Sequence, residues 1–324
     1  MKVLVTGASG MLGAATARAL VAGGHSVTVL QRRASGLGVA EVLGDITDDG
    51  VVRWACTGQD AVVHLAARVT VSGSWEDFER VNVGGTHTVL SAARAAGATR
   101  FVQVSSPSVA HSGSALFGVP AQPADPSAAR GPYARSKAVA ERAALAAGTE
   151  DFAVVAVRPH LVWGPGDTQL VGRVVERARA GRLVLVGGGG ALIDSTYVDN
   201  AADALVAALE RIDDLRGQSL VVTNGEPRTV RELLSAICRA ADVPAPDRSV
   251  PLPVAATGGT VVERAWALLG RDDEPPMTRF LAEQLATAHW FDQRHTREAL
   301  QWTPRVGLDE GFARLASWYA RTTH

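Results

Sequence analysis

The sequence predicts an α/β fold built on a doubly wound parallel sheet, with a smaller and mostly C-terminal substrate domain. Three observations support this. Short apolar runs of strand type alternate with helical patterns, a rhythm typical of parallel sheets. A glycine-punctuated turn joins the first apolar run, residues 3–5, to the first helical pattern. At 324 residues, the chain is long enough for one large domain or two unequal ones.

The elements follow from apolar periodicity and from the turn residues between them. Strands are expected at residues 3–5, 25–30, 41–44, 61–65, 100–104, 152–157 and 220–223. Helices are expected at residues 11–21, 82–96, 133–147, 171–180 and 229–241, with a further one beginning near 196–199. Residues 107–132, rich in proline, serine, glycine and alanine, predict a long functional loop.

Composition narrows the classes of function. The net charge of −1 gives no reason to expect a nucleic-acid partner. Cys56 and Cys238 lie far apart without metal-ligand spacing, so we expect free thiols, no metal site and a cytoplasmic location. No apolar run is long enough to span a membrane. Residues 250–270 are mostly apolar and predict either a cover over an apolar pocket or an element that contacts a membrane surface.

The glycine turn indicates a bound dinucleotide. Gly7, Gly10 and Gly13 follow a strand and open a helix, with Ser9 and Met11 between them. In a Rossmann fold the first glycine permits the tight turn, the second lets the backbone approach the pyrophosphate, and the third lets helix and strand pack closely. The helix N-terminus then faces the phosphate charge. The alternative is a structural glycine turn in some other α/β protein.

The end of the second strand predicts the kind of dinucleotide. An acidic residue there would hydrogen-bond the ribose of NAD, whereas arginine accommodates the 2′-phosphate of NADP. The chain has Gln31, Arg32 and Arg33 at this point and no carboxylate. We therefore expect NADP(H), with Arg32 as the main phosphate partner and NAD as the alternative cofactor. Two solvated arginines at the start of a loop are the other interpretation.

Further strand ends lie along the expected path of the cofactor. The residues concerned are Asp45, Ile46, Leu65, Ala66, Ala67 and Pro159. Asp45 follows the third strand, where an adenine ring would lie, although it could instead cap the next helix. Small residues after the fourth strand would let cofactor and backbone pass closely. Pro159 would lie against the edge of the nicotinamide ring. His160, which follows it, would either contact the substrate or pack beside the cofactor.

Tyr133 and Lys137 carry the predicted chemistry. They are four residues apart, so on a helix they share one face. A nearby ammonium, together with an oxidised nicotinamide, would lower the pKa of the phenol toward the working range. Lys137 is one of only two lysines among 32 basic residues, so the choice of a compact ammonium over guanidinium suggests a chemical need. The alternative is an ordinary surface pair on a helix.

These motifs resemble the extended short-chain dehydrogenase/reductase family over essentially the whole chain. The resemblance implies Ser106, Tyr133 and Lys137 as the catalytic triad, with Ser106 preferred to Ser105 because the family places its serine second in the pair. It also implies that Lys137 holds the ribose and that Asn82 is structural or contacts the cofactor. We expect a dinucleotide-binding domain from residues 1–162 and 194–222, and a substrate domain from residues 163–193 and 223–324.

The C-terminal part of the sequence indicates which branch of this family the chain resembles. The string from Glu274 to Arg279 and the string from His289 to Asp292 resemble the 3β-hydroxysteroid dehydrogenase-like branch. With residues 158–167 added, they look most like the bacterial 2-alkyl-3-oxoalkanoate reductases of long-chain olefin biosynthesis. This implies NADPH-dependent reduction of a 3-keto group on a long, apolar acid, and a homodimer. The alternatives are a 3β-hydroxysteroid or sterol dehydrogenase, a nucleotide-sugar epimerase, and a non-catalytic NADP-sensing regulator.

Overall fold

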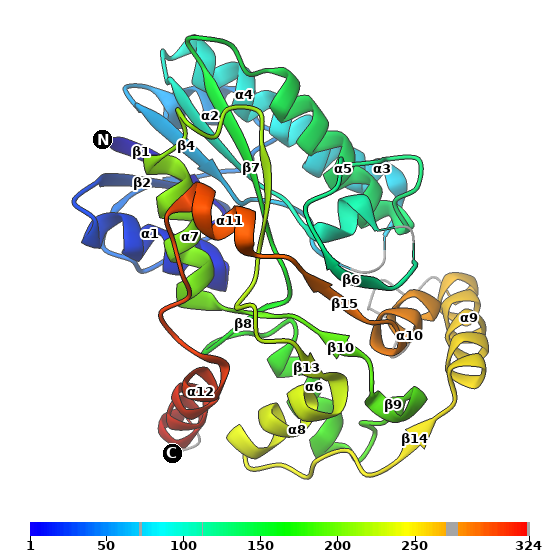
Figure 1. Ribbon diagram of the computed structural model, residues 1–324. Helices are drawn as coiled ribbons and strands as arrows, with labels where there is room; N and C mark the ends of the chain where they lie inside the picture. Colours follow the sequence, from blue (N-terminus) through cyan, green and yellow to red (C-terminus); the bar gives the residue numbers. More distant parts are fainter. Residues whose placement is uncertain (71–72, 112, 270–277, 323–324) are drawn as a thin grey trace.

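A computed structural model describes residues 1–70, 73–111, 113–269 and 278–322 of the chain. Its centre is a parallel sheet in which the connection from the third strand to the fourth crosses to the other side of the first strand, so that the direction of winding reverses between β1 and β4 (Figure 1). In spatial order its strands are β3 (Ala40–Leu43), β2 (Ser26–Gln31), β1 (Lys2–Thr6), β4 (Ala61–His64), β5 (Arg100–Val104), β7 (Ala153–Pro159) and β12 (Ser219–Val222). The predicted doubly wound fold is therefore confirmed.

Helices cover both faces of this sheet (Figure 1). One face carries α1 (Met11–Ala22) and α7 (Val198–Glu210), and the other carries α2 (Asp49–Cys56), α4 (Gly85–Ala95) and α5 (Gly131–Ala146). Strand residues point alternately to the two faces: Val3 and Val5 pack with the first pair of helices, while Leu4 packs on the opposite side. Both faces are thus buried, as the near-continuous apolar strands predict.

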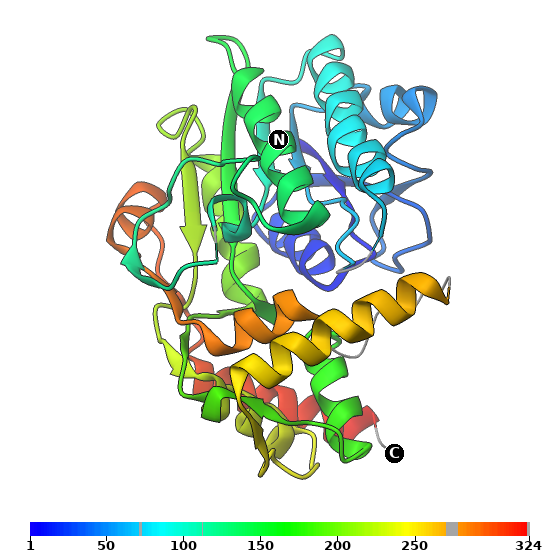
Figure 2. The ribbon, with the colours of Figure 1, turned by 90° about the vertical axis from the view of Figure 1, so that its right-hand side faces the viewer.

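Most of the remaining elements lie beyond the carboxyl ends of the main strands (Figure 2), whereas α11 (Arg294–Leu300) packs beside α7 and β12 (Figure 1). Short strands form a second sheet in the order β13 (Arg228–Thr229), β10 (Leu192–Ile193), β15 (His289–Phe291) and β6 (Leu116–Val119). Two strand pairs join β11 (Thr196–Tyr197) to β8 (Val162–Trp163) and β14 (Ser249–Val250) to β9 (Leu185–Val186). The other helices are α6 (Val171–Arg179), α8 (Val230–Ala240), α9 (Leu252–Leu268), α10 (Arg279–Ala286) and α12 (Leu308–Thr322).

Two expectations about local structure need correction. Residues 107–132 are not a plain loop, because they contain a 3-10 turn, η2 (Pro107–Ala110), and strand β6, which pairs with β15. The expected helix at 82–96 begins earlier, with α3 (Trp75–Phe78) and a π-helical segment, η1 (Glu79–Gly84), before α4. Pairing between distant segments stabilises β6, so no local pattern predicts it.

The apolar stretch at 250–270 forms α9, which packs against α10 (Figure 2). Val254 and Val261 on this helix are exposed. Within the described part of this stretch, no residue lines the large cavity reported below, and the two interpretations, a cover over an apolar pocket and a membrane-surface element, stay predictions. Gly270, and Glu274 to Met277 of the motif quoted above, lie outside the described residues. None of the helices described could cross a membrane.

A close approach between backbones fixes the first turn. Gly7 has φ +79°, a left-handed conformation that favours glycine, and a Cβ there would lie 2.8 Å from the backbone nitrogen of Ala66. A Cβ on Gly13 would lie 2.3 Å from the carbonyl oxygen of Gly7. Because backbone atoms oppose both positions, neither glycine can take a side chain without moving α1 away from the sheet.

We expect Gly13→Ala to lower the free energy of unfolding by about 3 kcal/mol, because the added methyl group overpacks a backbone contact. Urea denaturation would measure this change. Gly258→Ala is the matched control, since Gly258 lies in α9 with open space around its Cβ position and should not lose stability. Equal stability of Gly13→Ala and the native chain would contradict this account of the turn.

Candidate active site

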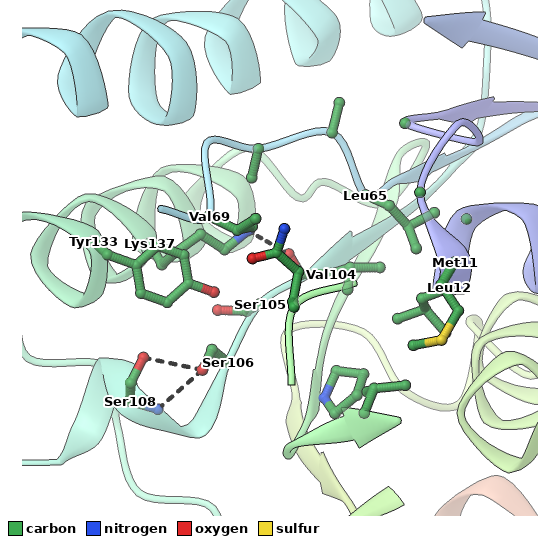
Figure 3. A pocket seen from close by; sticks show the side chains of 18 of the residues that line it. Met11, Leu12, Leu65, Val69, Val104, Ser105, Ser106, Ser108, Tyr133 and Lys137 are labelled. Carbon is green, nitrogen blue, oxygen red and sulfur yellow. Dashed lines mark hydrogen bonds between the residues drawn. The ribbon is translucent and has the colours of Figure 1, made fainter. Parts of the chain in front are cut away.

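One cavity of about 770 Å³ opens at the carboxyl ends of the central strands (Figure 3). This is where ligands bind in doubly wound sheets. Of the residues that the sequence singles out, those lining the cavity are Gly7, Ser9, Gly10, Met11, Gly13, Arg32, Asp45, Ile46, Leu65, Ala66, Ala67, Ser106, Tyr133, Lys137 and Pro159. Arg33 is exposed and is not among the lining residues. The structure therefore brings together nearly every predicted site residue.

The glycine turn has the properties of a phosphate cradle. Gly10 begins α1 without a side-chain cap, so the first backbone N–H groups of the helix have no side-chain acceptor. The turn is closed by the Gly10 N–H donating to the Gly7 carbonyl oxygen at 3.1 Å. These N–H groups and the helix dipole favour an anion at this end of the cavity. The residues present thus fit the pyrophosphate of a dinucleotide.

Asp45 lines the cavity and does not cap the next helix. Its carboxylate accepts hydrogen bonds from the backbone and side chain of Thr47, at 3.0 Å and 2.9 Å. Asp48 caps α2 instead, accepting from the backbone N–H of Gly50 at 2.9 Å. Burial raises the pKa of Asp45, but its bonds to Thr47 and the nearby Arg32 outweigh burial and lower the pKa overall. The alternative interpretation of Asp45 as a helix cap is therefore wrong.

Tyr133 and Lys137 both point from α5 into the cavity (Figure 3). The ammonium of Lys137 donates a hydrogen bond of 2.6 Å to the carbonyl oxygen of Val104, the last residue of β5. Burial disfavours its charged form and lowers its pKa to about 8, while the Glu141 carboxylate partly opposes this. Lys137 is thus a buried cation beside the phenol, and not half of a surface pair.

The phenol of Tyr133 shows the opposite pKa shift from the expected one. Burial raises its pKa, and the hydrogen bond with Ser106 only partly offsets this. The expectation that the ammonium of Lys137 lowers this pKa is not met in the structure, because desolvation of the phenolate is the larger effect. Tyr133 is consequently protonated at neutral pH, the state required of a proton donor.

The two serines after β5 differ in their surroundings. The Ser106 hydroxyl oxygen accepts hydrogen bonds from the backbone N–H and side chain of Ser108, at 3.3 Å and 3.0 Å (Figure 3). It also interacts with the hydroxyl of Tyr133. The Ser105 hydroxyl is buried with no hydrogen-bond partner among the described residues. Both serines line the cavity, and the contact with Tyr133 favours Ser106 as the one that works with the phenol.

Two buried interactions hold α5 in place. Asn82 donates to the Ser136 hydroxyl at 2.9 Å and is bonded on its other side to the backbone of Arg68, so its role is structural. Glu141 forms a buried bidentate ion pair with Arg158 of β7. These contacts fix the helix against the sheet, and hence the position of the side chains that it presents to the cavity.

Sequence reasoning missed part of the cavity wall. His111, Gln284 and His289 line it together with the apolar side chains of Leu116 and Phe291. These residues come from the segment after η2, from α10 and from the paired strands β6 and β15. His289 and Phe291 belong to the string quoted above for the family resemblance, but their place in the cavity wall depends on distant strand pairing, which that string does not reveal.

The site and fold agree with known sequence families. The sequence model of the NAD dependent epimerase/dehydratase family matches residues 3–222. The chain belongs to this family. It is accordingly an NAD(P)-dependent oxidoreductase of the short-chain dehydrogenase/reductase type, as the motifs predict.

Individual relatives within the family are similar over nearly their whole length. A 2-alkyl-3-oxoalkanoate reductase of Stenotrophomonas maltophilia is 42% identical, covering 97% of this chain and 98% of its own. A protein of the same name from Shewanella oneidensis is 37% identical, covering 96% and 84%. Among solved structures, MoeE5 in complex with UDP-glucose and NAD is 26% identical, with a TM-score of 0.75 and full coverage of both chains. The resemblance to this reductase group is thereby confirmed.

We expect the affinity for NADPH to fall severalfold as the pH rises through about 8, where the buried ammonium of Lys137 loses its proton. The pKa is lowered in the folded protein, so the charge is present below about 8 and lost above it. Fluorescence titration with NADPH on both sides of this pH would measure the change. Lys137→Met should bind more weakly and without this step, whereas a step of the same size in Lys137→Met would contradict the assignment.

Proposed function

We propose that the chain is an NADPH-dependent reductase of the 3-keto group of long-chain 2-alkyl-3-oxo acids, giving the 3-hydroxy acid. The observation that carries this proposal is the convergence of Ser106, Tyr133 and Lys137 on one cavity that also contains the glycine cradle. The full-length similarity to 2-alkyl-3-oxoalkanoate reductases supports the choice of substrate.

Each residue of the triad has one task in the proposed reduction. When bound, NADPH supplies the hydride that the 3-keto carbon receives. Tyr133, protonated because burial raises its pKa, donates a proton to the keto oxygen. Ser106 donates a hydrogen bond to the same oxygen as charge develops there. The ammonium of Lys137 would stabilise the phenolate that remains, and its N–H groups not bonded to Val104 would be available to the ribose hydroxyls.

The cofactor would lie along the carboxyl edge of the sheet. We assign its contacts to the residues that line this part of the cavity: Gly7, Ser9, Gly10, Met11, Gly13, Arg32, Asp45, Ile46, Leu65, Ala66, Ala67, Lys137 and Pro159. Arg32 lines the cavity at the end of β2 with no acidic residue beside it in the sequence. A guanidinium there matches the 2′-phosphate of NADP, which is why we propose NADPH over NADH.

The substrate end of the cavity favours an apolar ligand. Leu116, Leu161, Leu170 and Phe291 are among the residues that line the cavity. These apolar side chains suit a long aliphatic substrate, which is why we propose an apolar acid over a nucleotide-sugar. A sterol dehydrogenase would share the apolar wall, and it remains the second candidate on that ground.

We expect Tyr133→Phe to lower kcat for reduction of a 2-alkyl-3-keto acid by about 10²–10⁴-fold, because the proton donor is removed. The affinity for NADPH should be nearly unchanged, as fluorescence titration would show. Tyr319→Phe on α12 makes the same chemical change outside the cavity and serves as the control. Reduction at the native rate by Tyr133→Phe would refute the assigned role.

Cofactor preference offers a separate test. We expect Arg32→Ser to lower kcat/KM for NADPH by about tenfold to a hundredfold while leaving kcat/KM for NADH within about twofold, since a charged hydrogen bond to the 2′-phosphate is lost. The exposed neighbour provides the matched control, because Arg33 does not line the cavity and Arg33→Ser should keep the preference. Loss of preference in Arg33→Ser alone would overturn the assignment to Arg32.

A further inference from the structure

Three histidines from separate segments meet at the substrate end of the cavity. His111 follows η2, His160 follows β7, and His289 begins β15. The ring centroids of His160 and His289 are 4.9 Å apart and those of His111 and His289 are 6.2 Å apart, with the rings of each pair nearly perpendicular. All three line the cavity that contains Tyr133. The proposed proton and hydride transfers use none of them.

Two of these rings are buried without hydrogen-bond partners. His111 is 6% exposed and His289 is 3% exposed. Neither nitrogen of either ring meets a partner in full hydrogen-bonding geometry among the described residues, although the backbones of Gln284 and of His289 itself lie near enough to the His289 ring to act on its pKa. His160 differs, because its Nδ1–H donates to the carbonyl oxygen of Asp194 at 2.6 Å. Buried polar groups are nearly always paired, so two unpaired imidazoles facing a cavity point to a ligand that completes them.

The surroundings of these rings favour an anion. Burial lowers the pKa of His289 to about 4 and also lowers that of His111, so both are neutral near pH 7 and each carries one N–H donor. The positive charge of Arg130 also lowers the pKa of His111. The two acidic side chains in the cavity lining are engaged elsewhere, since Asp45 bonds Thr47 and Asp167 accepts from the backbone N–H groups of residues 169–171. No carboxylate of the lining thus competes for these donors.

We propose that His111 and His289 bind the carboxylate of the substrate, so that the site recognises a 3-oxo acid and not merely a ketone. This rests on the proposed function, which supplies the keto group that Ser106 and Tyr133 hold. The short turn η2 joins Ser106 to His111, and both side chains line the same cavity.

The third histidine supports this arrangement. His160 packs against His289 and fixes its ring for this role.

The test compares an acid with its ester. A 2-alkyl-3-hydroxy acid and its methyl ester are both stable, and their oxidation with NADP⁺ can be followed by NADPH absorbance. The ratio of kcat/KM for the acid to that for the ester should fall by about tenfold to a hundredfold in His289→Leu and in His111→Leu, mainly through KM for the acid. His289→Gln, which keeps an N–H donor, should recover part of the ratio. His87→Leu on the exposed face of α4 is the control and should leave it unchanged.

If kcat/KM fell by the same factor for the acid and for the ester in both leucine variants, the ratio would be unchanged. That result would overturn the assignment of the carboxylate site and leave the proposed reductase function standing. Calorimetric binding of the acid to the NADP⁺-loaded protein separates the two claims. Binding that depends on His289 without any turnover would refute the reductase and retain the carboxylate site. No binding of the acid to the native chain would refute the carboxylate site.

Discussion

The hydrogen bond from the buried ammonium of Lys137 to the carbonyl oxygen of Val104 is the contact on which the site depends. It joins α5 to the last residue of β5, immediately before Ser105 and Ser106. One bond therefore sets the distance between the phenol on the helix and the hydroxyls at the strand end. The ammonium itself is buried, with Lys137 5% exposed.

Further buried contacts keep this helix from moving. The pair between Glu141 and Arg158 lies one turn beyond Lys137, and Arg158 also donates to the carbonyl oxygen of Gln122 at 2.6 Å. Losing one partner of such a pair would leave an uncompensated buried charge, at a cost of about 3–5 kcal/mol. The same interaction thus ties together α5, the sheet and the segment that leads from β6 to α5. The geometry of the site is a property of the core, and not of a loop.

Local patterns predicted the parts of the site that lie close together in the sequence. The glycine turn and the spacing of Tyr133 and Lys137 each occupy one turn or one helix, so periodicity and chemistry identify them. The remaining parts of the site depend on pairing between strands that are far apart in the sequence. Strand β6 exists because β15 lies beside it, and His111 meets His289 only through that arrangement. The direction of the pKa shift of Tyr133 depends on how deeply the fold buries the ring. That depth of burial cannot be predicted from a sequence motif.

We propose that Ser106, Tyr133 and Lys137 support the reduction of a 3-keto group on a long apolar acid by NADPH. The most direct measurement is the rate of NADPH oxidation by the native chain with a freshly prepared 2-alkyl-3-keto acid, compared with a 3-ketosteroid and with a UDP-sugar. The account predicts rapid oxidation with the keto acid, slower oxidation with the steroid and none with the sugar. Oxidation with the steroid but not with the keto acid would contradict it.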